Sequence, residues 1–364
     1  MYKLILIFLA TITFIGCSKK GEEGETKPYE KEVSDQPKNI ILLIGDGMAL
    51  SQISAARTVA GNQLNMLRCD YIGIQSTHAA DKYVTDSGAS ATAMACGEKT
   101  NYYTIGVDTD GNPLTSIIEL AEANGMSTGI MTTSTIVHAT PAAFFAHQND
   151  RFAYEDIALQ LTYQDVDFFM GGGQLYFDQR SDGLNLIDSL LAKNYQVVQS
   201  LDEVSGNKKT AVFIANNHPQ RYAWGRGDVL GNSMEMAISK FEENNESFFI
   251  MVEGAQIDWG GDENDQGYLM SEMLDFDRAV GKALDFAEVD GNTLVIITGD
   301  HETGGFSLLD GNQANNSVEG GFLTTGHTGS MVPVFAFGPG AKEFIGVYEN
   351  ADIFHKMKTQ LGLD

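Results

Sequence analysis

Short apolar runs alternate with amphipathic segments along most of the chain, and this alternation limits the fold more than any other feature. The apolar runs are as long as strands and stay apolar at successive residues, which is typical of strands covered on both faces. They occupy 39–44, 71–76, 127–132, 166–170, 211–215, 247–252, 293–298 and 332–337. Amphipathic segments with helical spacing occupy 51–59, 114–123, 184–193, 233–243 and 268–287. The pattern predicts the α/β class, with a mostly parallel central sheet flanked by helices on both faces.

Three of the expected strands end in acidic or imidazole side chains. Asp46 follows 39–44, Glu253 follows 247–252, and Asp300 with His301 follows 293–298. A single acidic residue at such a place is usually a helix cap or a turn residue. The carboxyl ends of parallel strands meet at one edge of a sheet, so these side chains are expected to converge. Three converging groups, one with an imidazole, favour a site for a divalent metal ion.

The segment 84–97, VTDSGASATAMACG, is rich in small residues that let a helix start abruptly and pack close to a sheet. Ser87 is then expected at a helix N-terminus, where unpaired N–H groups favour an anion. One interpretation is that Asp86 or Ser87 is only the helix cap. The metal-ligand loops favour the other, in which nearby metal ions lower the pKa of the Ser87 hydroxyl and make it a nucleophile.

The composition indicates a globular protein with an acidic surface. Of its 364 residues, 43% are hydrophobic and 20% charged, which excludes disordered, coiled-coil and multi-span membrane classes. With 49 acidic and 23 basic side chains the formal net charge is −26, which argues against a nucleic-acid-binding surface. An anionic substrate would therefore need a local positive group.

Six short motifs occur in the order in which alkaline phosphatases carry them. They are IGDGM at 44–48, VTDSGASAT at 84–92, HATP at 138–141, VEGAQID at 252–258, TGDH at 298–301 and GHTG at 326–329. The chain resembles this family over about residues 39 to 340. The resemblance implies the family's fold and the metal-dependent hydrolysis of small phosphate monoesters through a phosphoserine intermediate, with release of inorganic phosphate.

The resemblance also implies a role for individual side chains. It makes Ser87 the phosphorylated nucleophile and Arg151 the residue that binds phosphate oxygens. It implies two zinc ions and one magnesium ion. Their expected ligands are Asp258, Asp262 and His327 for the first zinc; Asp46, Ser87, Asp300 and His301 for the second; and Asp46, His138, Thr140 and Glu253 for magnesium.

Three positions depart from the best-known bacterial pattern. His138 replaces an Asp of the magnesium site, and Trp259, expected near the substrate, replaces a Lys; both replacements resemble a subgroup of the family. Asp262 stands where the first zinc normally receives a histidine. If Asp262 is a ligand, that site is more acidic and suited to harder ions. The alternative is that Asp262 points to solvent and that Glu263, Asp265 or water completes the site.

Two other functions are alternatives to phosphomonoester hydrolysis. A phosphodiesterase of the same superfamily would share the two-metal site, but Arg151, Thr140 and Glu253 argue against it, because the diesterase branch generally lacks them. A non-catalytic phosphate- or metal-binding lipoprotein is the second alternative, raised by Asp262.

The N-terminal segment predicts export. Lys3 precedes an apolar run at 4–15 that ends in Gly16 and Cys17. This resembles a lipoprotein signal, so we expect a signal peptide at 1–16, a lipid anchor on Cys17, a flexible tether at 17–38 and the catalytic domain at 39–364. The alternative is an ordinary secretory signal. We expect attachment at the cell envelope, periplasmic or surface-exposed, through this anchor alone.

Two further features are less determined by the sequence. The segment between His301 and His327 has room only for a short insertion, where many alkaline phosphatases carry a larger one that contacts a second subunit, so a monomer is favoured. Cys69 and Cys96 could form a disulfide in an oxidising compartment, or Cys96 could be a packed thiol; the two interpretations are equally supported.

Overall fold

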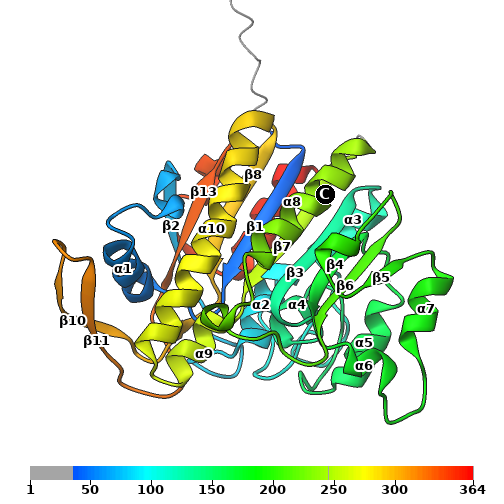
Figure 1. Ribbon diagram of the computed structural model, residues 1–364, viewed down its shortest axis with the longest axis horizontal. Helices are drawn as coiled ribbons and strands as arrows, with labels where there is room; N and C mark the ends of the chain where they lie inside the picture. Colours follow the sequence, from blue (N-terminus) through cyan, green and yellow to red (C-terminus); the bar gives the residue numbers. More distant parts are fainter. Residues whose placement is uncertain (1–35, 245, 364) are drawn as a thin grey trace, which may run out of the picture. The chain divides into compact units, whose positions relative to one another are not determined.

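A large, mostly parallel sheet forms the centre of the computed structural model, which describes residues 36–244 and 246–363 (Figure 1). Its ten strands within that part of the chain follow the order β14-β2-β13-β8-β1-β7-β3-β4-β6-β5. They are β1 (Asn39–Gly45), β2 (Tyr71–Ser76), β3 (Ser127–Thr135), β4 (Phe168–Gly172), β5 (Gln196–Val198), β6 (Thr210–Ala215), β7 (Phe248–Gly254), β8 (Thr293–Gly299), β13 (Val332–Phe337) and β14 (Gly346–Glu349). Only β13 pairs antiparallel, with β2 and β8. The predicted α/β class with a mostly parallel sheet is confirmed.

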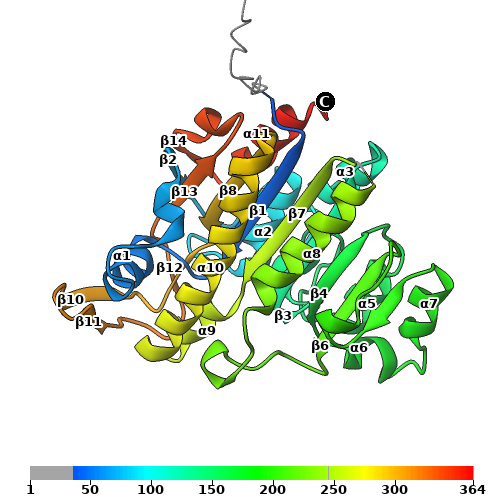
Figure 2. The same cartoon turned by 45° about the horizontal axis from the view of Figure 1, so that its top comes forward.

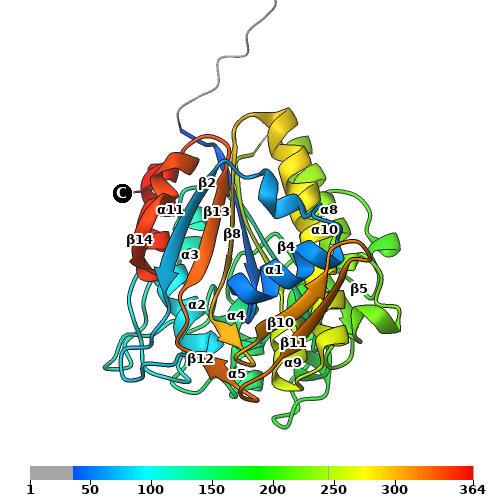
Figure 3. The same ribbon diagram turned by 90° about the vertical axis from the view of Figure 1, so that its left-hand side faces the viewer.

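Both faces of the sheet are covered by helices, as the continuous apolar runs require. In β1, Ile40, Leu42 and Ile44 pack into one core, and Ile41 and Leu43 pack into the other. Helices α1 (Leu50–Val59), α8 (Val229–Glu243) and α10 (Gln266–Asp290) cover the second core. The first core is covered by helices α2 (Ser87–Cys96), α3 (Ile117–Ala123), α5 (Tyr154–Leu161), α7 (Leu186–Ala192) and α11 (Ala351–Leu361). Figure 3 shows α11 on the opposite side of the sheet from α10.

The pairing of the central strands brings three chain segments to one edge of the sheet. β1 lies between β8 and β7, and Gly45 at its end pairs in register with Gly254 and Gly299 (Figure 2). Asp46 and Asp300 therefore leave neighbouring strand ends, and Glu253 occupies the end of β7. Four short helical or extended pieces add side chains beyond this edge: α4 (Ala139–Ala142), α9 (Gln256–Asp262), β9 (Glu302–Thr303) and β12 (His327–Thr328).

The predicted strands at 71–76 and 332–337 coincide with β2 and β13, and the other six agree within three residues at each end. α8 begins four residues before the expected 233–243. Helices α5 and α11, the edge strands β5 and β14, and the hairpin of β10 (Ser307–Asn312) and β11 (Ser317–Gly321) were not expected. In Figure 1 the hairpin projects beyond the body of the sheet, next to α1.

Cys69 and Cys96 are free thiols on opposite sides of the sheet. Cys96 is buried in the core that contains α2, whereas Cys69 packs against the core that contains α1 and α10. The sheet between them prevents the disulfide that the sequence left open. Burial raises the pKa of the Cys69 thiol to about 12, so it is protonated at neutral pH.

The N-terminal expectations concern residues that the structure largely leaves undescribed. The signal peptide at 1–16 and the tether at 17–38 lie outside the described residues, apart from the last three. Within residues 36–244 and 246–363, none of the helices combines the length and apolarity needed to cross a bilayer.

Candidate active site

The acidic and imidazole side chains predicted at the strand ends converge. Among the described side chains, three groups place one ligand atom per residue within 4.8 Å of one another. They are Asp46, Asp300 and His301; Asp258, His301 and His327; and Asp46, His138 and Glu253. Asp46 and His301 each belong to two groups, so the three potential metal sites share side chains and lie side by side.

The site contains many buried polar atoms without a hydrogen-bond partner in the described chain. They are both carboxylate oxygens of Asp46, Asp300 Oδ2, Glu253 Oε1, His138 Nδ1 and Thr140 Oγ1. One such atom costs about 1–3 kcal/mol, so a cluster of them is expected only where a bound group supplies the missing contacts. Carboxylate oxygens and imidazole nitrogens are the donors that zinc and magnesium take. The side chains therefore fit the metal ions that the family resemblance implies.

The electrostatics of the site also favour cations. Burial, and next the charge of Asp300, raise the pKa of Asp46 well above its ordinary range. Burial raises the pKa of Glu253 to about 7. Although burial opposes it, the neighbouring Asp300 carboxylate raises the pKa of His301 to about 9. Asp46 and Glu253 therefore hold protons more tightly than ordinary carboxyl groups do, because they are buried among carboxylates that repel one another. A bound cation would relieve the same repulsion.

Asp86 caps α2, which leaves the hydroxyl of Ser87 available for chemistry. Asp86 Oδ2 accepts from the backbone N–H of Gly88 at 3.0 Å, and Oδ1 accepts from that of Ala89 at 3.3 Å. Ser87 is the first helical residue, and its Oγ lies 3.3 Å from His301 Nε2. Of the two interpretations of this segment, capping belongs to Asp86, and Ser87 faces the metal-ligand groups.

Arg151 is buried beside the helix cap. Its Nη1 donates to Asp86 Oδ2 at 2.7 Å, whereas its Nε has no partner in the described chain. Its backbone N–H donates to the carbonyl oxygen of Tyr103 at 2.9 Å. Arg151 and Ser87 line the same cavity, of about 570 Å³. One edge of the guanidinium is anchored, and its other N–H groups can meet an anion in that cavity.

His327 is oriented by one backbone contact. Its Nδ1 lies 2.8 Å from the carbonyl oxygen of Thr85, which can only accept, so Nδ1 carries the hydrogen. Nε2 is then left with a lone pair, 3.5 Å from Asp258 Oδ1. The rings of His327 and His301 stack with their centroids 3.5 Å apart. This arrangement suits a ligand nitrogen.

Asp262 lies in the cavity but outside the three groups. His301, rather than Asp262, joins Asp258 and His327. Asp262 is half-buried, its Oδ1 has no partner in the described chain, and burial together with Asp258 raises its pKa to about 7. The alternatives named from the sequence have other partners: Glu263 accepts from Arg221 at 2.6 Å, and Asp265 caps α10.

Two side chains for which no role was predicted contact the expected ligands or pack beside them. The hydroxyl of Thr303 donates to Asp258 Oδ1 and lies 3.3 Å from His301 Nδ1, so it contacts two members of one ligand group. His218 packs against Trp259 and His138, with ring centroids 4.8 and 5.8 Å apart, and its Nδ1 accepts from the N–H of Thr135. Thr303 follows TGDH by two residues, which was the available signal; His218 had none.

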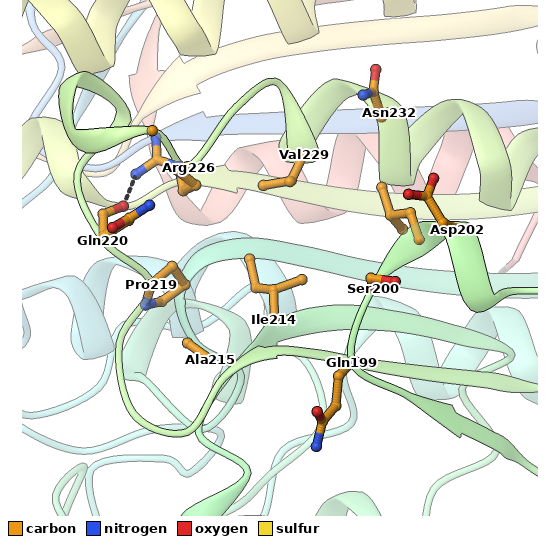
Figure 4. Close-up of a pocket in the computed structure, with 12 residues that line it drawn as sticks. Gln199, Ser200, Asp202, Ile214, Ala215, Pro219, Gln220, Arg226, Val229 and Asn232 are labelled. Carbon is orange, nitrogen blue, oxygen red and sulfur yellow. Dashed lines mark hydrogen bonds between the residues drawn. The ribbon is translucent and has the colours of Figure 1, made fainter.

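A second cavity, of about 530 Å³, has a different character (Figure 4). Gln199, Ser200, Gln220 and Arg226 are among its lining residues. Arg226 is already neutralised, because Nη2 pairs with both Glu272 and Asp275, and Nη1 donates to the carbonyl oxygen of Gln220 at 3.1 Å. None of its lining residues belongs to the three potential metal groups, so the cavity at Ser87 is the stronger candidate.

Comparisons with known proteins identify relatives of this chain. A family model described as alkaline phosphatase matches residues 37–319 and 307–363. "Alkaline phosphatase 3" of Bacillus subtilis is 31% identical over 96% of this chain and 95% of its own length. The alkaline phosphatase of the Antarctic bacterium TAB5 superposes with a TM-score of 0.87 at 43% identity, covering 90% of this chain and 99% of that one. A variant of it with histidine replaced by aspartate, 42% identical here with a TM-score of 0.86 and the same coverage, holds magnesium in a site called M3.

Proposed function

The chain belongs to the alkaline phosphatase family and is a metal-dependent phosphomonoester hydrolase, and we propose that Ser87, Arg151 and the three ligand groups are its catalytic machinery. One observation carries the proposal: the Ser87 hydroxyl, the anchored guanidinium of Arg151, and side chains of two ligand groups line one cavity. Phosphoryl transfer needs a nucleophile, positive charge on the phosphate oxygens, and compensation of charge on the attacking and leaving oxygens.

The residues divide the reaction between them. Ser87 Oγ attacks the phosphorus; the Oγ–P bond forms as the bond to the leaving alkoxide breaks, which gives phosphoserine. Arg151 holds two non-bridging phosphate oxygens, a bidentate contact that Lys cannot make. Water then attacks phosphoserine, releasing inorganic phosphate and restoring the hydroxyl. Bound divalent ions supply Lewis-acid stabilisation of the attacking and leaving oxygens.

We assign zinc to the two groups that contain His301, and magnesium to Asp46, His138, Thr140 and Glu253. The first two groups mix imidazole with carboxylate, the donor set of a borderline ion. The third is rich in oxygen donors apart from His138, and the magnesium bound in the M3 site of the TAB5 variant, a related enzyme, supports this choice. Asp262 would act on the Asp258 and His327 group from outside it.

Arg151 also favours monoesters over diesters. A dianionic phosphate monoester has one more charged non-bridging oxygen than a diester. The buried guanidinium can bind these charged oxygens, so it stabilises a bound monoester more than a bound diester. Hydrolysis of p-nitrophenyl phosphate and of bis-p-nitrophenyl phosphate, with and without added zinc and magnesium, separates the alternatives. A higher kcat/KM on the diester would establish a phosphodiesterase, and no turnover of either would establish a binding protein.

Replacing Ser87 tests the nucleophile directly. Ser87→Ala is expected to lower turnover by several orders of magnitude and to leave metal binding nearly intact, because the hydroxyl forms the covalent intermediate. Enzyme quenched with acid after incubation with ³²P-labelled substrate should carry label in the wild type and in the exposed control Ser54→Ala, and not in Ser87→Ala. Label at another residue in the wild type would refute the assignment.

Localisation and assembly are further parts of the proposal. The apolar run before Cys17 supports export and a lipid anchor, and the short segment between His301 and His327 supports a monomer. Cys17→Ser should release active enzyme from the membrane fraction. An unmodified N-terminus downstream of Cys17, in wild-type protein purified without detergent, would show an ordinary secretory signal instead.

A further inference from the structure

Tyr103 has a backbone conformation that is unusual for its side chain. Its φ is +69°, in the left-handed region. Among described non-glycine residues with positive φ, the other four are asparagines: Asn62, Asn194, Asn264 and Asn316. Asparagine tolerates this region, whereas a bulky aromatic residue there is a strained exception. Strain of this kind concentrates at functional sites, so a tyrosine at this position is expected to have a functional role.

The backbone of Tyr103 is fixed by the catalytic groups. Its N–H donates to Asp86 Oδ1 at 3.0 Å, and its carbonyl oxygen accepts from the N–H of Arg151 at 2.9 Å. These contacts hold the helix cap and the phosphate-binding arginine together, and they explain the left-handed conformation. They do not explain the phenol ring, because glycine would make both contacts without strain.

The ring of Tyr103 forms an aromatic wall with Phe152. The two centroids are 5.3 Å apart with the ring planes at 71°, and both rings line the cavity that contains Ser87. Tyr103 is 43% exposed and Phe152 is 51% exposed, so much of their apolar surface faces water. The Arg151 Cζ atom lies 5.9 Å from the Tyr103 centroid and 5.6 Å from that of Phe152. The wall therefore borders the place where the phosphate is expected.

We propose that Tyr103 and Phe152 bind the leaving group, so that the enzyme prefers phosphomonoesters carrying a planar aromatic ring, such as nucleoside 5′-monophosphates. The inference rests on the proposed function. Arg151 would hold the phosphate, and the ring of the leaving group would pack on the neighbouring aromatic surface. Every nucleobase has a π face, so such stacking is largely independent of base identity. The contact between the Tyr103 ring and the substrate then explains why a tyrosine, rather than a glycine, occupies this strained position.

A matched pair of substrates isolates the ring. Adenosine 5′-monophosphate and ribose 5-phosphate both release a primary alkoxide at C5 of ribose, and only the first carries a base. We expect wild-type enzyme to prefer the nucleotide by about tenfold in kcat/KM. Tyr103→Gly and Phe152→Ala should each reduce this ratio, and the double variant should bring it close to one. Tyr103→Phe, which keeps the ring, should preserve the ratio, as should Tyr163→Ala, which removes an aromatic residue 68% exposed outside the cavity.

The possible outcomes distinguish failure of the aromatic subsite from failure of the proposed phosphatase function. Hydrolysis of ribose 5-phosphate with a wild-type ratio near one would overturn the aromatic subsite and leave the phosphatase intact. A ratio that persists in the double variant would also overturn the subsite. Failure to hydrolyse either substrate or p-nitrophenyl phosphate would overturn the proposed function itself. A second pair, 2-phenylethyl and ethyl phosphate, distinguishes the sources of the ring: a preference in both pairs indicates aryl groups in general, and one in the first pair alone indicates nucleosides.

Discussion

Asp262 is the expected carboxylate ligand of zinc that lies outside the three groups of converging side chains. It lines the cavity and senses the charge of Asp258, but it is not part of the group formed by Asp258, His301 and His327. A carboxylate at this place adds negative charge near the group without the softer imidazole donor that zinc prefers. Asp262 therefore stays a predicted ligand, and its carboxylate is expected to affect metal affinity and selectivity.

Asp262→His is expected to tighten zinc binding by about tenfold, because a neutral imidazole near Asp258 supplies the preferred donor. Competition with a chromophoric chelator measures the affinity, and Asp262→Ala is the matched variant that removes the carboxylate without adding a donor. Equal zinc affinities in wild type and in both variants would show that Asp262 has no influence on the metal.

His138 provides a second test at a single residue. Its Nδ1 is buried with no partner in the described chain and belongs with Asp46 and Glu253. Magnesium prefers oxygen donors, so His138→Asp should lower the magnesium concentration for half-maximal activation by about tenfold. Titration of metal-stripped enzyme with magnesium at fixed zinc measures this. An unchanged midpoint would remove His138 from the magnesium site.

At the scale of elements, α2 and the loop before α5 are connected through one carboxylate. Asp86 accepts hydrogen bonds from Gly88, Ala89, Tyr103 and Arg151. It therefore both begins the helix that carries Ser87 and positions the guanidinium of Arg151. The nucleophile and the phosphate-binding group keep their relative places because they share this residue.

Asp86→Ala should lower the free energy of unfolding by about 4 kcal/mol and raise KM, since the helix loses its cap and a buried Arg151 loses its charge partner. Denaturant unfolding and steady-state kinetics measure the two effects. Ser116→Ala is the control: it removes the cap of α3, for about 1 kcal/mol, away from the cavity. If Asp86→Ala loses no more stability than Ser116→Ala and keeps its KM, the coupling is wrong.

The elements that could be predicted from the sequence are those whose burial produces a regular pattern of apolar residues. Strand β1 is buried on both faces, so its continuous apolar run and the acidic residue after it were readable. The β10 and β11 hairpin is largely exposed and has neither an apolar run nor a clear alternation, which is why it was not expected. Tyr103 acts through a backbone angle fixed by contacts with Asp86 and Arg151, and no local pattern indicated it. For Thr303 the available signal was its position two residues after TGDH, whereas its contact with Asp258 depends on a segment far away in sequence.

For the whole molecule, the buried carboxylates connect metal binding to stability. In the metal-free fold, burial raises the pKa of Glu253 from 4.5 to about 7. The folded state therefore holds this proton more tightly than the unfolded state does. Stability contributed by the protonated form is present at low pH and is lost as pH rises from about 4.5 to about 7. Asp46 and Asp262 are shifted in the same direction.

Metal-free wild type should thus lose stability across that window relative to metal-free Glu253→Gln, by on the order of 3 kcal/mol. Unfolding in urea at several pH values between 4.5 and 8, after treatment with a chelator, measures the difference. Added zinc and magnesium should restore the wild type at the alkaline end, because they bind the folded state. A difference between the two proteins that does not change with pH would contradict the assignment of Glu253 as a buried, metal-dependent carboxyl.

The direction of β1 has a consequence for the predicted anchor. The described chain enters the sheet at Asn39, and Asp46 follows the far end of the same strand. At about 3.3 Å per residue, some 20 Å of strand separates that point of entry from the catalytic cleft. Any segment that leads into β1 therefore joins the described domain at the end of the strand farthest from the catalytic residues.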